Sequence, residues 1–308
     1  MTAIEQLSKL AAQTGSTVQL AAPLASHTTF KIGGPCDILI EPKDEDALCG
    51  ILAFCREQEI PVCAIGNGSN LLIPDEGMDG AVLLIGSGLG KIDVHSDGTV
   101  VCGAGASLKK LCMAAYDRAL TGLEFAYGIP GSCGGAAFMN AGAYGGEMKD
   151  VLISCTHVTP AGEHGVLSGD ALGLSYRHSA YKENGCVITS LALKLLPGNR
   201  EQIKERMDEL MQRRRDKQPL EYPSAGSIFK RPPGHFAGTL IEQCGLKGAQ
   251  IGGAQVSEKH AGFIVNAGGA TCADVLNLIE HIQKTVLAQT GVTLECEVRA
   301  MPGRRNHL

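Results

Sequence analysis

The sequence has no tryptophan, and aromatic residues make up only 4% of its 308 residues. Aromatic rings are the usual platform for stacking nucleic-acid bases, so a chain with so few of them is poorly equipped for that task. The net charge is −5 and the pI is near 6.0, whereas binding a phosphate backbone usually needs a basic face. We therefore expect no nucleic-acid partner.

Long hydrophobic runs are also missing. No stretch reaches the roughly 18 uninterrupted apolar residues that a membrane-spanning helix needs. The N-terminus, MTAIEQLSKLAAQ, carries an early glutamate and lacks the apolar core of a signal peptide. With 44% hydrophobic and 19% charged residues, the composition is that of a globular protein. We expect a cytoplasmic monomer without a membrane partner.

The twelve cysteines lack any CxxC pair and any Cys/His spacing typical of metal ligands. They are scattered singly, mostly inside apolar runs. Examples are Cys49, Cys55, Cys63, Cys102, Cys112 and Cys186. Cysteine in such a setting behaves as a small hydrophobic residue, so we expect neither a metal site nor disulfides.

Glycine, in contrast, is abundant, with 40 residues. The stretch 125–146, FAYGIPGSCGGAAFMNAGAYGG, has almost no charged side chain, and a second loop, 66–70 (GNGSN), directly follows the apolar run Val62 to Ile65. Glycine has no Cβ and tolerates positive φ, so several backbone N–H groups can approach one ligand. Two such loops predict one extended, phosphate-bearing ligand between them, although each alone also fits a plain surface loop and neither matches the dinucleotide or P-loop fingerprint.

The hydrophobic pattern predicts an α+β fold. In the first two thirds we expect helices at 3–13, 44–58 (capped by Asp44) and from Ser107, strands at 36–40, 61–65, 81–85 and 186–196, a hairpin with a type I′ turn at Asp97-Gly98 and a hairpin around 160–162. Beyond these we expect a linking helix at 199–216, strands at 226–230, 251–256, 262–266 and 292–301, a helix at 238–244 and a helix capped by Thr271 with Asp274. The predicted domains are a lead-in at 1–27, a domain at 28–198 and a C-terminal domain at 199–304.

Three polar residues stand where their setting does not obviously need them. Arg177 lies in GLSYRHS just before a predicted buried strand, where its guanidinium could fork onto a carboxylate. Ser227 follows a glycine at the start of a strand, and Glu297 lies in LECEVR. Each also has a simpler interpretation: a surface arginine, a serine that caps the backbone, and a solvated strand face.

Taken together, the motifs resemble those of the UDP-N-acetylenolpyruvoylglucosamine reductases. The resemblance covers nearly the whole chain through TTFKIGGPCD, IGNGSNLLI, GLEFAYGIPGSCGGAAFMNAGAYGGE, SYRHS, KQPLEYPSAGSIFKRPPG, AGTLIEQCGLKG, KHAGFIVN and LECEVR. Several long motifs in one order are far more specific than a single glycine pattern. The chain lacks the extra tyrosine-bearing loop of one branch, so it resembles the shorter, type II branch.

The resemblance implies an FAD-binding module of the vanillyl-alcohol oxidase (PCMH) type followed by a C-terminal α/β domain that binds the UDP-sugar. It implies that NADPH reduces FAD and that hydride then passes to the enolpyruvyl ether of UDP-N-acetylglucosamine enolpyruvate. The product would be UDP-N-acetylmuramate, a precursor in peptidoglycan synthesis and so in bacterial cell-wall biogenesis.

The resemblance also assigns residue roles. Arg177 and Glu297 match the residues that polarise the substrate carboxylate and stabilise the enolic intermediate, and Ser227 matches the serine that protonates C2. Because a glutamate helps an adjacent anion only when it holds a proton, we expect Glu297 to be protonated during the reaction. Tyr176, Lys217 and Lys247 match substrate-binding positions. The FAD contacts are assigned to Gly66, Asn67, Gly68, Ser69, Asn70, Leu71, Gly128, Ile129, Pro130, Gly131, Ser132, Gly134, Gly135, Ala136, Asn140, Ala141, Gly142, Ala143 and Tyr144.

Two alternatives remain open at this point: a flavin oxidase or dehydrogenase acting on another alcohol or lactone, and a non-catalytic nucleotide-binding module on the same fold. The first explains the glycine loops but not the SYRHS, GSIFK and CEVR elements. One departure from the family pattern is Cys133, where a small apolar residue is more usual. Its thiol is either a volume substitute or a point of oxidation sensitivity.

Overall fold

The computed structural model describes residues 1–304, which form two compact units built from interleaved segments. The first unit comprises Met1–Ala21, Asp37–Asn67 and Gly80–Arg213, and the second comprises Ala22–Cys36, Gly68–Asp79 and the chain from Arg214. The contiguous domain boundaries expected from the sequence stay predictions. Compactness groups the residues differently, because two early segments pack with the C-terminal part.

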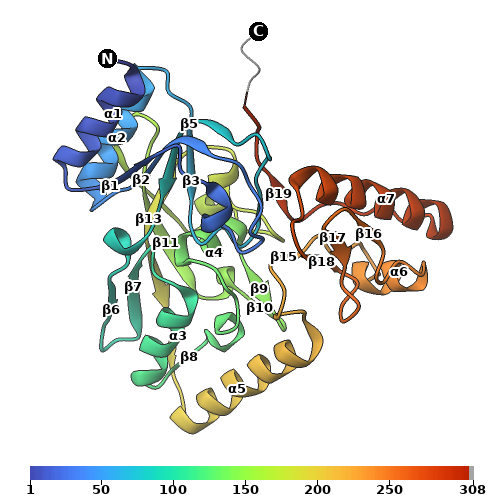
Figure 1. The fold of residues 1–308 in the computed structure, drawn as a ribbon. Coiled ribbons are helices and arrows are strands. Elements are labelled where there is room, and N and C mark those ends of the chain that lie inside the picture. Colours follow the sequence, from blue (N-terminus) through green and yellow to red (C-terminus); the bar gives the residue numbers. More distant parts are fainter. Residues whose placement is uncertain (305–308) are drawn as a thin grey trace. The chain divides into compact units, whose positions relative to one another are not determined.

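Two sheets dominate the first unit (Figure 1). One has the order β1-β2-β5-β3, in which β3 and β5 run parallel; the other is antiparallel with the order β12-β11-β13-β7-β6. The strands are β1 (Thr17–Leu20), β2 (Cys36–Glu41), β3 (Val62–Ile65), β5 (Met78–Leu84), β6 (Ile92–Val94), β7 (Thr99–Gly103), β8 (Leu120–Thr121), β9 (Gly142–Ala143), β10 (Gly146–Glu147), β11 (Leu152–Val158), β12 (His164–Ser168), β13 (Val187–Lys194) and β14 (Leu196–Pro197).

Most helices of this unit form where the sequence predicts them; the exception is the helix at Cys133–Met139, which lies inside the glycine-rich stretch and was not expected. The helices are α1 (Ala3–Gln13), α2 (Glu45–Glu57), α3 (Leu108–Asp117), α4 (Cys133–Met139) and α5 (Arg200–Lys217), whose last turn belongs to the second unit. Asp44 caps α2 by accepting a hydrogen bond from the N–H of Ala47 at 2.9 Å, and Ser107 caps α3 in the same way. α1 and α2 lie side by side (Figure 1), and their apolar faces enter the core that the sheets share.

One predicted turn is wrong in type. β6 and β7 form the expected hairpin, but a type I′ turn needs positive φ at both Asp97 and Gly98, and only Gly98 has it, at +84°. The N–H of His95 instead donates to the carbonyl of Thr99, which leaves a three-residue loop closed by a left-handed glycine. The side chain of Asp97 accepts from the N–H and the hydroxyl of Thr99, and these bonds favour this loop.

The second unit contains a small antiparallel sheet with the order β15-β18-β17-β16. α7 packs along this sheet, and α6 contacts α7 (Figure 1). The elements are β4 (Leu71–Leu72), β15 (Ser224–Ser227), α6 (Ala237–Gln243), β16 (Gln250–Ile251), β17 (Ala254–Val256), β18 (Phe263–Asn266), α7 (Cys272–Thr290) and β19 (Arg299–Ala300). Phe30, Ile32 and Leu72 are buried in its core, which explains why the early segments belong here.

Three predicted strands of this unit are wrong in extent. The strand expected at 226–230 is β15, which begins at Ser224 and ends at Ser227. The strand expected at 251–256 is a tight hairpin, because Gly252 has a φ of +53° and reverses the chain between β16 and β17. The strand expected at 292–301 is regular only at Arg299 and Ala300, which pair with β4, while Cys296 forms an isolated bridge with Phe229. At 251–256 and at 292–301 the alternating apolar residues correctly indicate burial. The paired length is shorter than expected because Gly252 reverses the first segment and because β4, the partner of the second, has only two residues.

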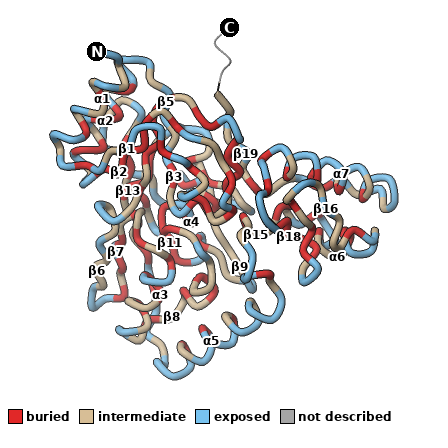
Figure 2. Tube along the Cα trace, in the orientation of Figure 1, coloured by how far each residue is buried: buried red, intermediate tan, exposed pale blue. Residues whose placement is uncertain are grey.

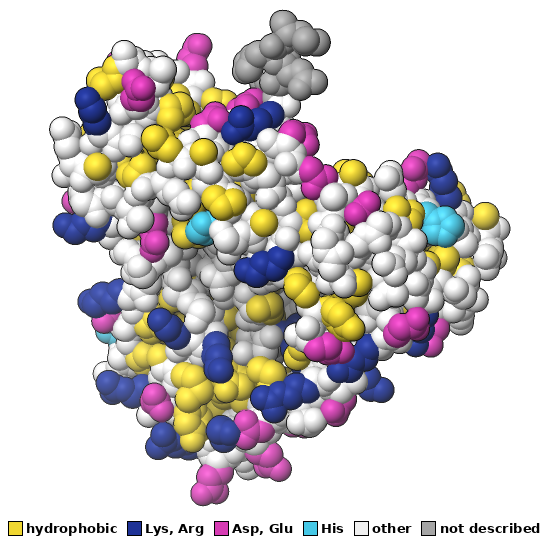
Figure 3. All heavy atoms as spheres, in the orientation of Figure 1, with side chains coloured by type: hydrophobic (Ala, Val, Ile, Leu, Met, Phe, Trp, Pro, Cys, Tyr) yellow, Lys and Arg dark blue, Asp and Glu magenta, His cyan; other side chains and the backbone are white. Residues whose placement is uncertain are grey.

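Exposure and charge follow the elements. Figure 2 shows α5 largely exposed, and only Ile203, Met207 and Leu210 are buried on it. On the face in Figure 3, basic and acidic side chains are interspersed around this helix, in keeping with ion pairs along it such as Arg213 with Glu209 at 3.6 Å. Within residues 1–304 no helix is long and apolar enough to cross a membrane, and no group of three or more His, Cys, Asp or Glu residues is arranged to hold a metal ion.

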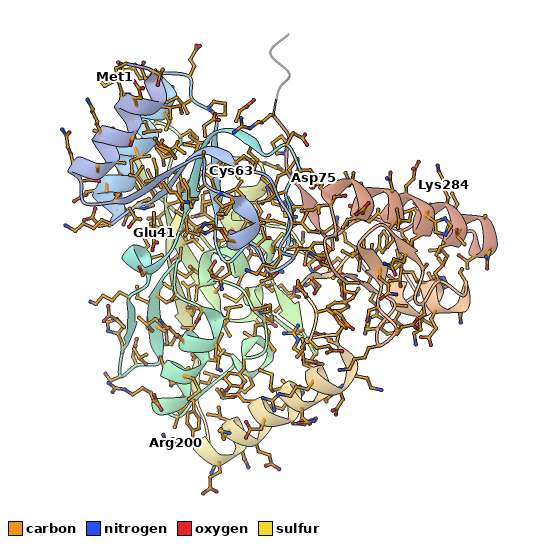
Figure 4. All side chains as sticks on the ribbon, in the orientation of Figure 1. Met1, Glu41, Cys63, Asp75, Arg200 and Lys284 are labelled. Carbon is orange, nitrogen blue, oxygen red and sulfur yellow. The ribbon has the colours of Figure 1, made fainter. Side chains whose placement is uncertain are left out.

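The N-terminus of α7 is held by a residue far away in the sequence. Thr271 and Asp274 form the predicted capping box. In addition, the carboxylate of Asp75 accepts hydrogen bonds from the N–H groups of Cys272 at 2.7 Å and Ala273 at 3.1 Å, and Figure 4 shows Asp75 at this helix end. A carboxylate at this position also complements the helix dipole, so Asp75 fastens the segment 68–79 to α7 inside the second unit.

Candidate active site

The two glycine-rich stretches meet within the first unit. A Cβ on Gly66 would lie 2.1 Å from the hydroxyl oxygen of Ser132, so only glycine permits this approach. The side-chain amide of Asn67 donates to the carbonyl of Pro130 at 3.3 Å. The expectation that these stretches lie together is therefore correct for residues 66–67 and 130–132.

Three amides of the second stretch are already used by the protein. The N–H groups of Cys133 and Gly134 donate to the carbonyls of Ala106 and Ala104, both at 2.8 Å, and the N–H of Gly135 donates to the Ser132 hydroxyl. A Cβ on Gly134 would lie 2.7 Å from the Cβ of Ala104. The N–H groups of Gly134 and Gly135 are therefore not available to a ligand. These glycines would contact a ligand only through van der Waals approach of their backbone, which the missing Cβ permits.

These stretches fit a flavin dinucleotide in their chemistry. The side chains where they meet are small or uncharged, and Asn67 and Pro130 remain exposed beside half-buried Gly131. Amides and hydroxyls can donate hydrogen bonds to a diphosphate, and uncharged, weakly polar surroundings suit an aromatic ring system. At the end of the stretch, Tyr144 has a φ of +54°, and the guanidinium of Arg213 lies 5.1 Å from the centre of its ring.

Asn140 connects the glycine stretch to the loop that carries Arg177. It ends α4 in the left-handed conformation, with a φ of +42°, and is fully buried. Its side-chain amide donates to the Glu147 carboxylate at 2.7 Å and to the Ser175 carbonyl at 2.9 Å, and its oxygen accepts from the N–H of Lys149 at 2.8 Å. The side chain therefore fixes the start of the Arg177 turn.

Arg177 lies in a strained tight turn. Ser175 and His178 exchange two backbone hydrogen bonds, at 3.2 and 3.0 Å, which leaves Tyr176 and Arg177 as the two turn residues. Arg177 has a φ of +56°, a conformation that costs a residue other than glycine about 1–2 kcal/mol. Its guanidinium carbon lies 5.2 Å from the centre of the Tyr176 ring, and Tyr176 is 50% exposed. Such strain persists only where neighbouring contacts impose it, and here the bonds of Asn140 to Ser175 and of Ser179 to the Phe138 carbonyl do so.

Ser227 is presented by a β-bulge in the second unit. Ser224 pairs with Val265 and Ser227 with Phe263, so two residues of β15 face one residue of β18. The extra residue is accommodated at Gly226, whose φ is +76°. A bulge of this kind turns the following side chain away from the regular ladder, and Ser227 remains half-buried.

Glu297 pairs along the backbone with Ile228, the residue that follows Ser227. Its N–H donates to the carbonyl of Ile228 at 2.7 Å, one residue after Ser227. The Asn70 side chain donates to the Glu297 carbonyl at 3.1 Å, and the Asn70 carbonyl accepts from Arg299. The second unit thus brings together Ser227, Glu297 and the end of the first glycine loop.

The remaining predicted residues are less closely gathered. Lys217 is the last residue of α5, and Lys247 follows α6, where its ammonium pairs with Glu242 at 2.6 Å. Arg177 belongs to the first unit, whereas Ser227 and Glu297 belong to the second. The glycine loop itself is divided, with Gly66 and Asn67 in the first unit and Gly68 to Leu71 in the second.

Cys133 behaves as a packing residue. It is completely buried, and a hydrogen bond with Cys102 together with burial raises the pKa of its thiol. A thiol that keeps its proton and has no exposed surface is a poor nucleophile and resists oxidation. Of the two interpretations of this departure from the family pattern, the structure favours the volume substitute.

Sequence reasoning missed two positioning features. The bulge at Gly226 and the bond from Asn140 to Ser175 were not expected, because a register shift and a buried side-chain bond have no simple periodic signature. The glycine before Ser227 was the available signal for the first, and an asparagine in a run of small residues was the signal for the second.

Two family models match the chain. One, described as FAD binding domain, matches residues 36–168, and the other, described as UDP-N-acetylenolpyruvoylglucosamine reductase, C-terminal domain, matches residues 218–301. Together they span both parts of the predicted architecture and confirm the α+β fold class.

Curated relatives match at high identity over nearly their full length. The UDP-N-acetylenolpyruvoylglucosamine reductase of Latilactobacillus sakei is 51% identical over 92% of this chain and 92% of its own, and that of Caldanaerobacter subterraneus is 50% identical over 91% and 92%. The crystal structure of the reductase from Thermus caldophilus superposes with a TM-score of 0.80 at 37% identity, covering 93% of this chain and 99% of that one.

Proposed function

The chain belongs to the UDP-N-acetylenolpyruvoylglucosamine reductase family, and on that premise we propose that Arg177, Ser227 and Glu297 are its catalytic residues. The reaction is the NADPH-dependent reduction of UDP-N-acetylglucosamine enolpyruvate to UDP-N-acetylmuramate in peptidoglycan synthesis, with FAD as cofactor. Membership of this family removes the two alternatives left open by the sequence, an oxidase of another alcohol and a non-catalytic module.

Bound FAD supplies the hydride relay from NADPH to the enolpyruvyl double bond. The protein must then manage the negative charge that develops at C2 of the substrate and spreads into its carboxylate. Donors aimed at a developing charge contribute most when they are held in place beforehand. We propose that Arg177 binds the substrate carboxylate, because a guanidinium can donate two parallel hydrogen bonds to it. The tight turn, in which Arg177 has a φ of +56°, fixes the backbone position from which this side chain extends.

Ser227 is proposed to donate the proton to C2. A hydroxyl of high intrinsic pKa suits this step, because the carbanion is strongly basic. Glu297 is proposed to hold a proton and to donate a hydrogen bond to the enolic oxygen. The observation that supports this pair is a backbone hydrogen bond next to Ser227. Ile228, which follows Ser227 in the chain, accepts this bond through its carbonyl from the N–H of Glu297 at 2.7 Å.

The loop 66–71 and the stretch 128–144 are proposed to bind FAD, supported by the contact between Gly66 and Ser132. Tyr176, Lys217 and Lys247 are proposed to bind the UDP-sugar. The ammonium groups of the two lysines complement a diphosphate, and the phenol of Tyr176 is exposed beside Arg177. The cytoplasmic location, the monomeric state and the domain boundaries at 28, 199 and 304 are likewise proposals.

The test separates the two half-reactions. We expect Ser227→Ala to retain FAD and its reduction by NADPH but to lose turnover of the enolpyruvyl substrate by at least about a hundredfold, as expected for loss of a general acid. Ser224→Ala is the matched control, because it removes a hydroxyl from the same strand and its backbone carbonyl, which accepts from Thr29, is kept.

Arg177→Lys and Glu297→Gln are expected to lower turnover strongly with little change in FAD content. Loss of the flavin in either variant would show that the residue has a structural role. If Ser227→Ala kept normal turnover, the assignment of Ser227 as proton donor would be wrong.

A further inference from the structure

Cys49, His164 and Glu45 form a linked cluster in the first unit, outside the residues assigned to the reaction. The Nε2 atom of His164 lies 3.5 Å from the Sγ of Cys49, and its Nδ1 lies 3.1 Å from the Oε1 of Glu45. Cys49 is half-buried, and the His164 side chain is 60% exposed. A thiol, a base within hydrogen-bond reach and a third group that orients the base are the parts of an activated nucleophile.

Local structure explains how these residues meet. Glu45 and Cys49 are four positions apart on α2 and therefore share one face of the helix. His164 begins β12, directly after the hairpin turn that contains Gly162. Gly162 has a φ of +82°, and a Cβ there would lie 2.5 Å from the carbonyl oxygen of Cys49. The turn therefore rests on α2 at Cys49 and brings His164 over the thiol.

The hydrogen-bond directions follow from the chemistry of the groups. A carboxylate can only accept, so His164 donates through Nδ1 to Glu45, and its Nε2 carries the lone pair that faces the thiol. The hydroxyl of Thr189, which is only 2% exposed, also donates to the Oε1 of Glu45, at 2.9 Å. Glu45 is thereby held from the core side and keeps the imidazole in the orientation that can accept a proton from Cys49.

We propose that Cys49 is a site of covalent modification by low-molecular-weight disulfides, with His164 as its general base and Glu45 as the residue that positions the imidazole. In this step His164 takes the thiol proton while the sulfur of Cys49 attacks one sulfur of the disulfide. The disulfide's S–S bond breaks, a mixed disulfide forms on Cys49, and the departing thiolate receives the proton from His164. One S–S bond is exchanged for another, so no further oxidant is required.

The electrostatic surroundings make the base necessary. Burial and the carboxylates of Glu45 and Asp46 raise the pKa of the Cys49 thiol, so the thiol keeps its proton at neutral pH and reacts only when a base removes it. Cys186 provides the comparison inside the same unit. Burial also raises the pKa of its thiol, but its Sγ is directed at the carbonyl of Asn184 at 3.7 Å, and a carbonyl does not take up the proton.

The experiment uses the full chain with FAD bound and oxidised glutathione as the probe. Modification at neutral pH is followed by peptide mapping and mass spectrometry, and we expect Cys49 to react about tenfold faster than Cys186, or more. His164→Gln should lower the rate at Cys49 to near that of Cys186, a loss of at least about tenfold, in line with the contribution of a positioned general base. Reductase turnover should not change, because His164 is not part of the catalytic machinery.

Two further variants sharpen the result. Glu45→Gln should slow the reaction of Cys49 less than His164→Gln does, because the base is kept and only its orientation is weakened. Gly162→Ala should slow it as well, since the added Cβ displaces the turn from Cys49.

Equal rates at Cys49 and Cys186 in the unaltered protein would overturn the proposal, and this comparison needs no variant to fold. An undiminished rate at Cys49 in folded His164→Gln would overturn the role of the histidine and with it the proposal.

Discussion

Removing the side chain of Asn140 should destabilise the first unit by about 4 kcal/mol. The change deletes three hydrogen bonds: two to backbone groups, at about 1 kcal/mol each, and one to the Glu147 carboxylate, at about 2 kcal/mol. Because the site is completely buried, water does not replace the lost partners easily.

Two variants separate the hydrogen bonds from the backbone conformation. Glycine adopts the φ of +42° without strain, so Asn140→Gly removes the side chain and its hydrogen bonds without adding a left-handed penalty. Alanine adds a left-handed penalty, so Asn140→Ala should be about 1 kcal/mol less stable than Asn140→Gly.

The assay is urea unfolding followed by far-UV circular dichroism, with substrate turnover measured on the folded fraction. Turnover should fall in both variants, because the Ser175 carbonyl at the base of the Arg177 turn loses its donor. A change below about 1 kcal/mol in Asn140→Gly, with normal turnover, would refute the idea that this side chain holds the turn.

Three further predictions address other parts of the molecule. Asp75→Ala should lower the free energy of unfolding of the second unit by about 2–3 kcal/mol, because two charge-assisted hydrogen bonds to the first turn of α7 are lost. Asp75→Asn should lower it by less, because these bonds are only weakened. Hydrogen exchange along α7 measures the change, and unchanged protection of α7 would contradict the prediction. Gly66→Ala should lower the FAD content, read from the visible absorption of the purified protein, because the added Cβ would lie 2.1 Å from the Ser132 hydroxyl. The control is Gly50→Ala, at an exposed helix position with open space around it. This variant should keep the flavin and raise the free energy of unfolding by up to about 1 kcal/mol. Hydrogen bonds from the N–H and hydroxyl of Thr99 lower the pKa of Asp97 to about 2, so the stability that this carboxylate contributes is complete above its unfolded pKa near 4 and is lost as the pH falls toward 2. The difference in unfolding free energy between the unaltered protein and Asp97→Asn, from urea titrations at several pH values, should therefore shrink between about pH 4 and pH 2. A difference that does not depend on pH would show that the bonds add nothing.

Much of the fold could be predicted from the sequence because its signals are local. The caps Asp44, Ser107 and Thr271 begin helices in the structure, and the alternation at 152–168 gives the hairpin of β11 and β12. The turn at Asp97 was predicted wrongly, because the Asp-Gly pair favours a two-residue loop only when nothing else competes. Here the bonds from Thr99 to the Asp97 side chain favour a longer loop.

The candidate site was predictable as a set of residues but not as an arrangement. Two glycine-rich loops indicated a common ligand, and Gly66 does contact Ser132. The mutual placement of Ser227 and Glu297 depends on the bulge at Gly226 and on a pairing between segments about 70 positions apart, which no local pattern reveals. The bond from Asn140 to Ser175 is hidden for the same reason.

The interleaving of the two units has a consequence for anyone who divides the gene. The polypeptide passes from one unit to the other after residues 21, 36, 67, 79 and 213, so no single cut yields two self-sufficient halves. A fragment that starts at residue 199 would lack Phe30, Ile32 and Leu72 from its interior and the clasp that Asp75 forms on α7. Such a piece should be recovered from cells as insoluble or protease-sensitive material, and a covalent graft of 22–36 and 68–79 would be needed to restore it.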